Sequence, residues 1–278
     1  MKKNKWLVAV TMTSALFLAA CGTDEAEETK EPSEEVVEQE VIDLAKEAET
    51  FKAYASEQMP LFVEDLKLLK QQLDENKLED AQKLYPLVRM HVERLQPLKS
   101  SFADEFAVLD GKMAKGKEAE IAGFAKVEQA LFADQSASAA ASELVAVIQA
   151  AEDLTAKLET EKLDGMQMLE DAEAMLASAE KQLNGSEVSF VAIDVYEVKA
   201  NVEAVEQMVA AFMSRAETAT AAKLTEQTVA FNKVVEFYEI GKEDYIKYDI
   251  FTNAQKTELV DAVKNVQTAF VAMKDSIK

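Results

Sequence analysis

Apolar residues recur every three or four positions along most of the chain, which is the spacing of an α-helix that buries one face. Two stripes are the clearest, and they consist of Val198, Val202, Val205, Val209 and Phe212, and of Leu259, Val263, Val266, Phe270 and Met273. No segment of the sequence has the sustained apolar–polar alternation that is typical of a strand. The pattern therefore predicts an all-α protein.

Turn-forming residues divide the chain from about Val41 onward into about eight helices. We predict the breaks at Glu75-Asn76, 111–116, 134–138, Asp164-Gly165, Asn184-Gly185, 218–220 and 241–252. The last helix begins with Thr252-Asn253-Ala254-Gln255, which has the spacing of a capping box. Short connections favour antiparallel neighbours, so we expect up-and-down helical bundles, with two four-helix bundles packed together.

The first 20 residues have the charge and length of a bacterial export signal. Three lysines precede an apolar run over residues 6–20, which contains no acid. The run ends in Leu18-Ala19-Ala20-Cys21, which resembles the lipobox of bacterial lipoproteins, where the cysteine is lipidated and becomes the first residue of the mature chain. The alternative is a buried free cysteine, and it is disfavoured because an exported thiol without a disulfide partner is a liability. We expect Cys21 to anchor the chain to membrane lipid at the extracytoplasmic face.

Acidic residues dominate the segment that follows the anchor. Residues 22–40 carry nine acids against one lysine, a composition too charged to collapse. We therefore expect a signal peptide over 1–20, an acidic tether over 21–42 and a helical domain over 43–278. Removal of the signal takes the formal charge from −22 to −25, which makes nucleic acid an unsuitable partner and favours cations or basic surfaces.

Several classes of enzyme lack their residues in this sequence. The chain has one histidine and one cysteine, the latter at the lipid position, and it has no glycine-rich phosphate loop. Carboxylate pairs carry little information in a chain with 52 acids. We expect a protein that is not an enzyme.

Four segments, read together, resemble the imelysin-like EfeO/EfeM family. They are Leu84-Tyr85-Pro86 with Arg89-Met90-His91-Val92-Glu93-Arg94-Leu95-Gln96-Pro97, then Phe102-Ala103-Asp104 with Leu109-Asp110, then the run from Gly123 to Phe132, and last the run from Asp194 to Ala204. Tyr248-Asp249 and Phe251-Thr252 also match the segment that precedes the last helix of the family. The resemblance covers roughly residues 45–275.

The resemblance implies an exported all-α protein of two four-helix bundles. Such a protein would be the extracytoplasmic component of a ferrous-iron uptake system, beside an iron permease and a haem peroxidase. Because an acidic tether stands where many relatives carry a cupredoxin domain, the chain looks like the shorter EfeM form. The alternative is a helical scaffold of the cell envelope that binds no metal. A peptidase, which follows only from the historical classing of imelysin-like proteins, is the weakest reading.

The resemblance also implies a metal site, and two of its ligands are changed here. The family's His-x-x-Glu motif falls at Ala125-Lys126-Val127-Glu128, so the imidazole is missing, and its Glu-x-x-Glu motif reads Glu93-Arg94-Leu95-Gln96. Asp110 completes the set, and Glu197 is a weaker addition. Oxygen ligands alone bind Fe²⁺ less well and suit Ca²⁺, Mg²⁺ or Mn²⁺ better. The alternative for the glutamates is a solvated or salt-bridged helix face, neutralised by Arg89, Arg94 or Lys126.

The single histidine is not part of this set. His91 lies two positions before Glu93, and side chains at that spacing do not share a helix face. We therefore expect His91 to be structural or surface-exposed.

Overall fold

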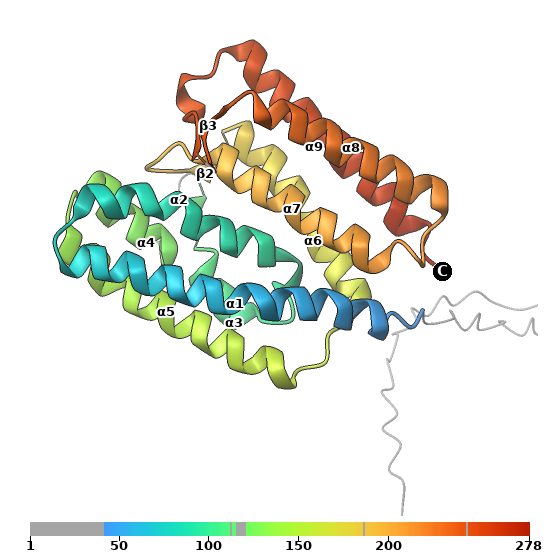
Figure 1. Cartoon of the computed structure of the whole chain (residues 1–278), viewed down its shortest axis with the longest axis horizontal. Coiled ribbons are helices and arrows are strands. Elements are labelled where there is room, and N and C mark those ends of the chain that lie inside the picture. Colours follow the sequence, from blue (N-terminus) through green and yellow to red (C-terminus); the bar gives the residue numbers. More distant parts are fainter. Residues whose placement is uncertain (1–41, 112, 115–120, 186, 243) are drawn as a thin grey trace, which may run out of the picture. The chain divides into compact units, whose positions relative to one another are not determined.

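The computed structural model describes residues 42–111, 113–114, 121–185, 187–242 and 244–278. Within these residues the helices are α1 (Ala45–Asp74), α2 (Leu78–Leu95), α3 (Ala103–Leu109), α4 (Phe124–Glu128), α5 (Ala137–Thr160), α6 (Gly165–Leu183), α7 (Asp194–Phe212), α8 (Thr218–Glu236) and α9 (Asn253–Asp275) (Figure 1). The only strands of the described residues are two short antiparallel pairs, β1 (Met113–Ala114) with β2 (Glu187–Val188) and β3 (Glu239–Gly241) with β4 (Asp244–Tyr245). The all-α prediction is confirmed.

Helices α6 to α9 form an up-and-down bundle, as the antiparallel pairing of their side chains shows. Lys264 and Lys274 of α9 contact Glu180 and Glu173 of α6 in reverse order. Asn232 of α8 donates a hydrogen bond to Glu206 of α7 at 2.7 Å. Each helix therefore packs against its neighbours along the chain, and α9 closes the bundle against α6.

The N-terminal half of the body is built differently. The long helices α1, α2 and α5 pack together, and α1 buries a stripe that runs from Phe51 to Leu73. Against α5 lie the short helices α3 and α4 in place of one long helix. A 3₁₀ turn, Gln96–Leu98, follows α2, and a π-helical turn, Gln129–Ala133, follows α4. The fold thus has nine α-helices in the described residues, two of them short, where the periodicity predicts about eight.

The boundaries test the predicted breaks. The capping box is confirmed, because the Thr252 hydroxyl accepts from the Gln255 amide N–H and the Gln255 side chain accepts from the Thr252 N–H. The break expected near 218–220 exists but lies a few residues earlier, at 213–217, since α8 begins at Thr218. Threonine and alanine can sit in the first helical turn, so their presence there does not mark a break.

One contact between the two halves positions the candidate site. Helices α2 and α7 lie side by side and run in the same direction, since Arg89 contacts Glu197 and Arg94 contacts Glu203. Equivalent turns of the two helices therefore face each other in register. Among the described residues, no helix combines the length and the apolar composition needed to span a membrane.

Candidate functional site

Arg89 lies at the centre of the carboxylates that the sequence nominates. Its Nη2 donates to Glu93 Oε1 at 2.8 Å and to Glu197 Oε1 at 3.1 Å, and its Nε donates to the same Glu197 oxygen at 3.2 Å. Glu93 lies one turn further along α2, while Glu197 comes from the facing turn of α7. Both the guanidinium and Glu93 are buried, with Glu93 fully so. The pair of parallel helices thus brings together two acids that are 104 positions apart in the sequence.

The end of α3 and the residue after it also contact Arg89. The Nη1 of Arg89 donates hydrogen bonds to the carbonyl oxygens of Leu109 at 3.0 Å and Asp110 at 3.1 Å. The Asp110 carboxylate lies 4.0 Å from Arg89 Nη2 and is paired with the partly exposed Lys99. The ring of Phe124 lies 5.3 Å from the guanidinium carbon. Burial lowers the pKa of Arg89, but Glu197 and Glu93 raise it by more, so the guanidinium stays charged.

Glu128, at the end of α4, contacts a different set of groups, among them Tyr85, which lies one turn before Arg89 in α2. It accepts hydrogen bonds from the Tyr85 hydroxyl and the Ser189 hydroxyl, each at 2.9 Å, and from the Phe190 N–H at 2.6 Å. Burial raises the pKa of the Glu128 carboxyl, and the neighbouring Glu197 raises it further. Glu128 therefore ties the segment after β2 to α2, and its charge repels that of Glu197.

Asp194, at the first position of α7, is a further member of this acidic centre. Burial first, and then the charge of Glu197, raise the pKa of Asp194 to about 7. Glu128 also raises it, while a hydrogen bond with Gln182 lowers it. Gln182 of α6 also donates to Glu197 Oε2. Glu197 thus lies close enough to Glu128 and Asp194 to raise the pKa values of both carboxyls.

Gln96 lies at the edge of this centre and is almost fully buried. It lines a polar cavity of about 730 Å³ with Glu93, Lys99 and Asp110. Its Nε2 has no hydrogen-bond partner among the described residues. A carboxylate at this position would add a fourth negative charge to the Glu93, Asp110 and Glu197 group, whereas the amide that stands here is neutral.

Ala125, where the family motif has its histidine, lies beside the Asp110-Gly111 turn. A Cβ placed on Gly111 would lie 3.0 Å from the Ala125 nitrogen, so α4 starts directly against that turn. Gly123 makes this approach possible, because its φ of +52° is left-handed and a Cβ there would lie 1.8 Å from the Val108 carbonyl oxygen. A side chain at position 125 thus begins next to Asp110 and one turn before Glu128.

His91 is structural, as expected, but buried and not at the surface. Its ring stacks on Phe62 with 5.5 Å between the ring centroids, and its Nε2 lies 2.9 Å from Asp65 Oδ2. Both partners belong to α1, on the side of α2 that faces away from Glu93 and α7.

The alternative of a solvated helix face is wrong for Glu93, which has 0% of its surface exposed. The salt-bridged alternative is correct for Glu93, because one of the cations Arg89, Arg94 and Lys126 pairs with it. Arg89 neutralises Glu93, whereas Arg94 pairs with Glu203 at 2.7 Å and Lys126 pairs with Glu143 at 3.9 Å.

The acidic centre contains five acids. Glu93, Asp110 and Glu197 are buried and Glu128 and Asp194 are half-buried, and Arg89 and the half-exposed Lys99 are described cations that contact members of the group. Within the described residues, however, no three acids, histidines or cysteines are grouped so that they could hold a metal ion as their side chains stand. Carboxylate oxygens suit a hard cation, but Glu93 Oε1 and Glu197 Oε1 both contact Arg89 Nη2.

Sequence reasoning did not assign roles to four residues of this centre. Tyr85 and Asp194 stand in the segments that carry the family resemblance, and Gln182 and Ser189 do not. The spacing of Arg89 and Glu93 by four residues is a signal that predicts their ion pair. Nothing in the sequence indicates that Gln182 and Ser189 come to this centre, because Gln182 contacts Glu197 of another helix and Ser189, in the loop after β2, contacts Glu128.

Comparisons with known proteins bear on the family. No protein-family model matches the chain. An Efem/EfeO family lipoprotein of Staphylococcus haemolyticus is 23% identical over 275 residues, which cover 94% of this chain and 96% of the relative. The chain is a homologue of the Efem/EfeO family lipoproteins. An Efem/EfeO family lipoprotein of Staphylococcus aureus is 25% identical over 222 residues, which cover 78% of each chain. The resemblance seen in the motif segments is therefore confirmed over most of the chain.

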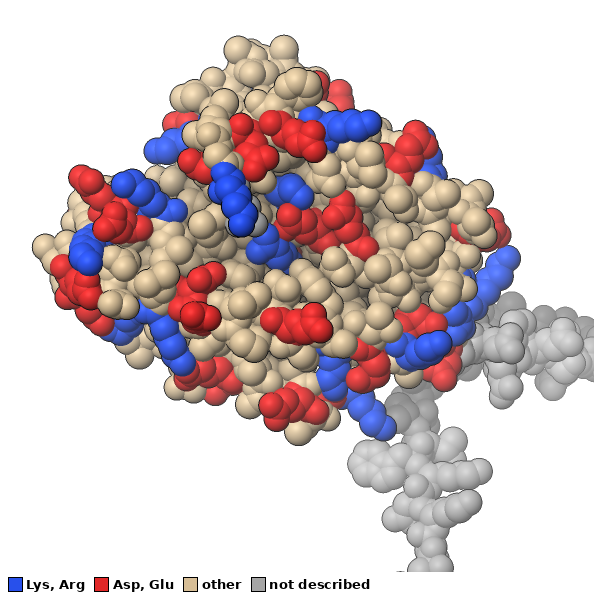
Figure 2. Space-filling model, in the orientation of Figure 1, with Lys and Arg blue, Asp and Glu red and all other residues tan. Residues whose placement is uncertain are grey.

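The surface of the body differs from its interior in how charges are arranged. On the face that Figure 2 shows, acidic and basic side chains are interspersed and many lie next to a partner of opposite sign. The concentrated acidic group is inside, around Arg89. The predicted lipidation site Cys21, the signal peptide and the acidic tether lie outside the described residues.

Proposed function

We propose that the chain is a lipid-anchored, extracytoplasmic component of an iron-uptake system of the EfeO/EfeM type, and that its acidic centre binds a divalent cation. The observation that carries the proposal is the closeness of Glu128, Asp194 and Glu197, since the charge of Glu197 raises the pKa values of the other two carboxyls. Carboxylates that repel one another in a largely buried site are costly, and they become protonated or take up a cation. A cation bound at Glu128, Asp194 and Glu197 would relieve their mutual repulsion.

Cys21 is the lipid attachment in this proposal, supported by the lipobox and by relatives that are named lipoproteins. Iron is the cargo that the family resemblance suggests. An iron permease and a haem peroxidase are the partners suggested by the same resemblance. The oxygen ligands favour Mn²⁺, Mg²⁺ or Ca²⁺ over Fe²⁺, because the imidazole of the family motif is replaced by Ala125.

A second candidate function is a helical scaffold of the cell envelope that binds no metal. It is favoured by the position of Arg89, whose guanidinium already supplies positive charge to Glu93 and Glu197. In that case Arg89 is the permanent counter-ion of the centre, and the helical bundles serve to present a surface.

Restoring the imidazole distinguishes the two. We expect Ala125→His to bind Fe²⁺ or Zn²⁺ about tenfold more tightly than the parent, which corresponds to about 1.4 kcal/mol. A nitrogen donor three positions before Glu128 and beside Asp110 would complete a mixed set of ligands. Isothermal titration calorimetry measures the gain.

The control is Glu128→Gln in the same background, which removes one ligand charge and should cancel the gain. Circular dichroism checks that both variants stay folded. If folded Ala125→His binds no more tightly than the parent, the carboxyls do not act as a metal site and the scaffold function is the better account.

A further inference from the structure

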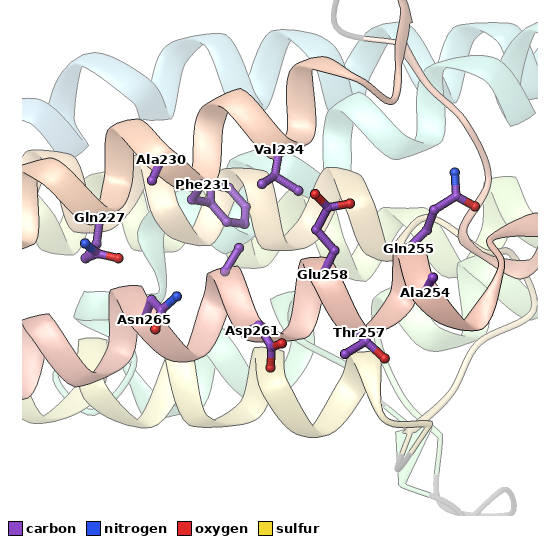
Figure 3. Close-up of a pocket in the computed structure, with 11 residues that line it drawn as sticks. Gln227, Ala230, Phe231, Val234, Ala254, Gln255, Thr257, Glu258, Asp261 and Asn265 are labelled. Carbon is purple, nitrogen blue, oxygen red and sulfur yellow. The ribbon is translucent and has the colours of Figure 1, made fainter.

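The outer face of the α8–α9 pair carries a groove that the acidic centre does not use. The groove has a volume of about 570 Å³. Its floor consists of Ala230, Phe231 and Val234 from α8 and Ala262 from α9. Figure 3 shows these α8 side chains extending toward α9, with Glu258 rising from α9 toward Val234. Alanines on both helices keep the groove shallow, so another backbone can approach it closely.

The apolar surface continues beyond the groove at the end of α8. Ala230, Val234 and Phe237 follow one another at spacings of four and three residues, so they share a helix face. Phe237 is 82% exposed, and Ile240 just beyond it is 65% exposed. A soluble helical bundle gains nothing from leaving a phenylalanine this exposed, and contiguous apolar surface rimmed by polar groups is typical of an interaction site.

The rim of the groove is acidic and amidic. Glu258 and Asp261 stand on it, beside Gln227, Gln255 and Asn265, and none of the described residues that line the groove is a lysine or arginine. The nearest lysines of α9 are engaged elsewhere, since Lys256 lies 4.8 Å from the centroid of the Tyr248 ring and Lys264 pairs with Glu180 at 3.2 Å. Among the described residues, neither rim acid forms a salt bridge.

The acidic rim therefore indicates which kind of partner binds in the groove. A second copy of this chain would bring acid against acid, because the chain has a net charge of −22. The acidic segment 22–40 is unsuitable for the same reason. An amphipathic helix with flanking lysines or arginines fits the groove, because its apolar stripe packs on the apolar floor and its cations pair with the acidic rim.

We infer that the α8–α9 groove is a docking site for a basic amphipathic helix of a partner protein. The apolar stripe of that helix lies over Ala230, Val234 and Phe237, and its cations face Glu258 and Asp261. Helix α8 is 19 residues long, or roughly 28 Å, so it can receive a partner helix of about five turns. This inference does not rest on the proposed cation site, whose acids Glu128, Asp194 and Glu197 do not line the groove.

A model peptide tests the site in the whole mature protein. The probe is a fluorescent peptide of about three heptads with leucine at the apolar positions and lysine elsewhere, and the comparison peptide carries glutamate in place of lysine. Anisotropy is measured at about 0.15 M salt, where long-range attraction to an acidic protein is screened. We expect saturable binding of the lysine peptide and none of the glutamate peptide.

Matched variants locate the binding. Glu258→Gln with Asp261→Asn should weaken binding of the lysine peptide about tenfold. Glu79→Gln with Asp80→Asn, at the exposed start of α2, makes the same change in net charge and should leave binding unchanged. Phe237→Ser should weaken binding about fivefold, whereas Val145→Ser, at an exposed position of α5, should leave it unchanged.

Three results would overturn the inference. The first is equal weakening by the groove pair and the α2 pair, which would mean that net charge alone attracts the peptide. The second is a dimer in sedimentation that Phe237→Ser disperses, which would make a second copy the occupant. The third is binding to phosphatidylglycerol vesicles that depends on Phe237, which would make the surface a membrane contact.

Discussion

Replacing Arg89 by methionine should destabilise the protein by roughly 3–5 kcal/mol, the usual effect of removing one partner from a buried ion pair. Methionine keeps much of the volume but leaves Glu93 and Glu197 buried without their counter-charge, and it leaves two backbone carbonyls without a donor. Urea unfolding followed by circular dichroism measures the loss.

Arg94→Met is the matched control on the same helix. Arg94 pairs with Glu203 at 2.7 Å, and both side chains are partly exposed, so its removal should cost only about 1 kcal/mol. If the two substitutions have the same effect, Arg89 is not the counter-ion that holds the centre together.

Asp194→Asn should stabilise the protein at pH 8 and leave its stability at pH 4 unchanged. The pKa of Asp194 is raised to about 7 in the folded protein, so the folded state holds a proton that the unfolded state releases near pH 4. Stability from this group is therefore fully present below pH 4 and is lost as the pH rises to 7. The asparagine lacks that loss, and we expect a gain of roughly 2–4 kcal/mol at pH 8.

The measurement is the difference in unfolding free energy between variant and parent across the pH range. Taking the difference removes the contribution of other groups, such as Glu203, whose pKa is lowered despite burial because Arg94 and Lys199 are close. Asp249→Asn is the control, since it makes the same chemical change at an exposed residue that lines a cavity of about 860 Å³ together with Asp194. A difference for Asp194→Asn that does not vary with pH would contradict the assigned role.

The helical architecture could be predicted because it depends on local signals. The stripes of α7 and α9 and the Thr252 capping box follow from spacing that each helix carries within itself. The parallel packing of α2 against α7 could not be predicted, since it joins helices from different halves of the chain. The break at 111–116, which separates α3 from α4, was predicted, whereas the separation of α3 from α2 by the 3₁₀ turn at Gln96–Leu98 was not.

The candidate site, like the fold, could be predicted from the sequence only in part. The i, i+4 pair of Arg89 and Glu93 follows from helix geometry, and the family resemblance places Asp110, Glu128 and Glu197 near it. The Arg89 guanidinium contacts both Glu93 and Glu197 because α2 and α7 are in register, and no sequence pattern specifies that register. The raised pKa of Asp194 has the same origin, because burial by packed helices and the charge of Glu197 cause it.

Calorimetric titration of the unaltered mature protein with Mn²⁺ tests the central proposal most directly. At about 0.15 M salt, exposed acids bind cations weakly and without saturation. The proposal predicts saturable binding of about one cation per chain, as expected for a single oxygen-ligand site. It also predicts that Glu128→Gln abolishes this binding, and that Glu79→Gln with Asp80→Asn does not. Heats that never saturate, or saturable binding that survives Glu128→Gln, would contradict it.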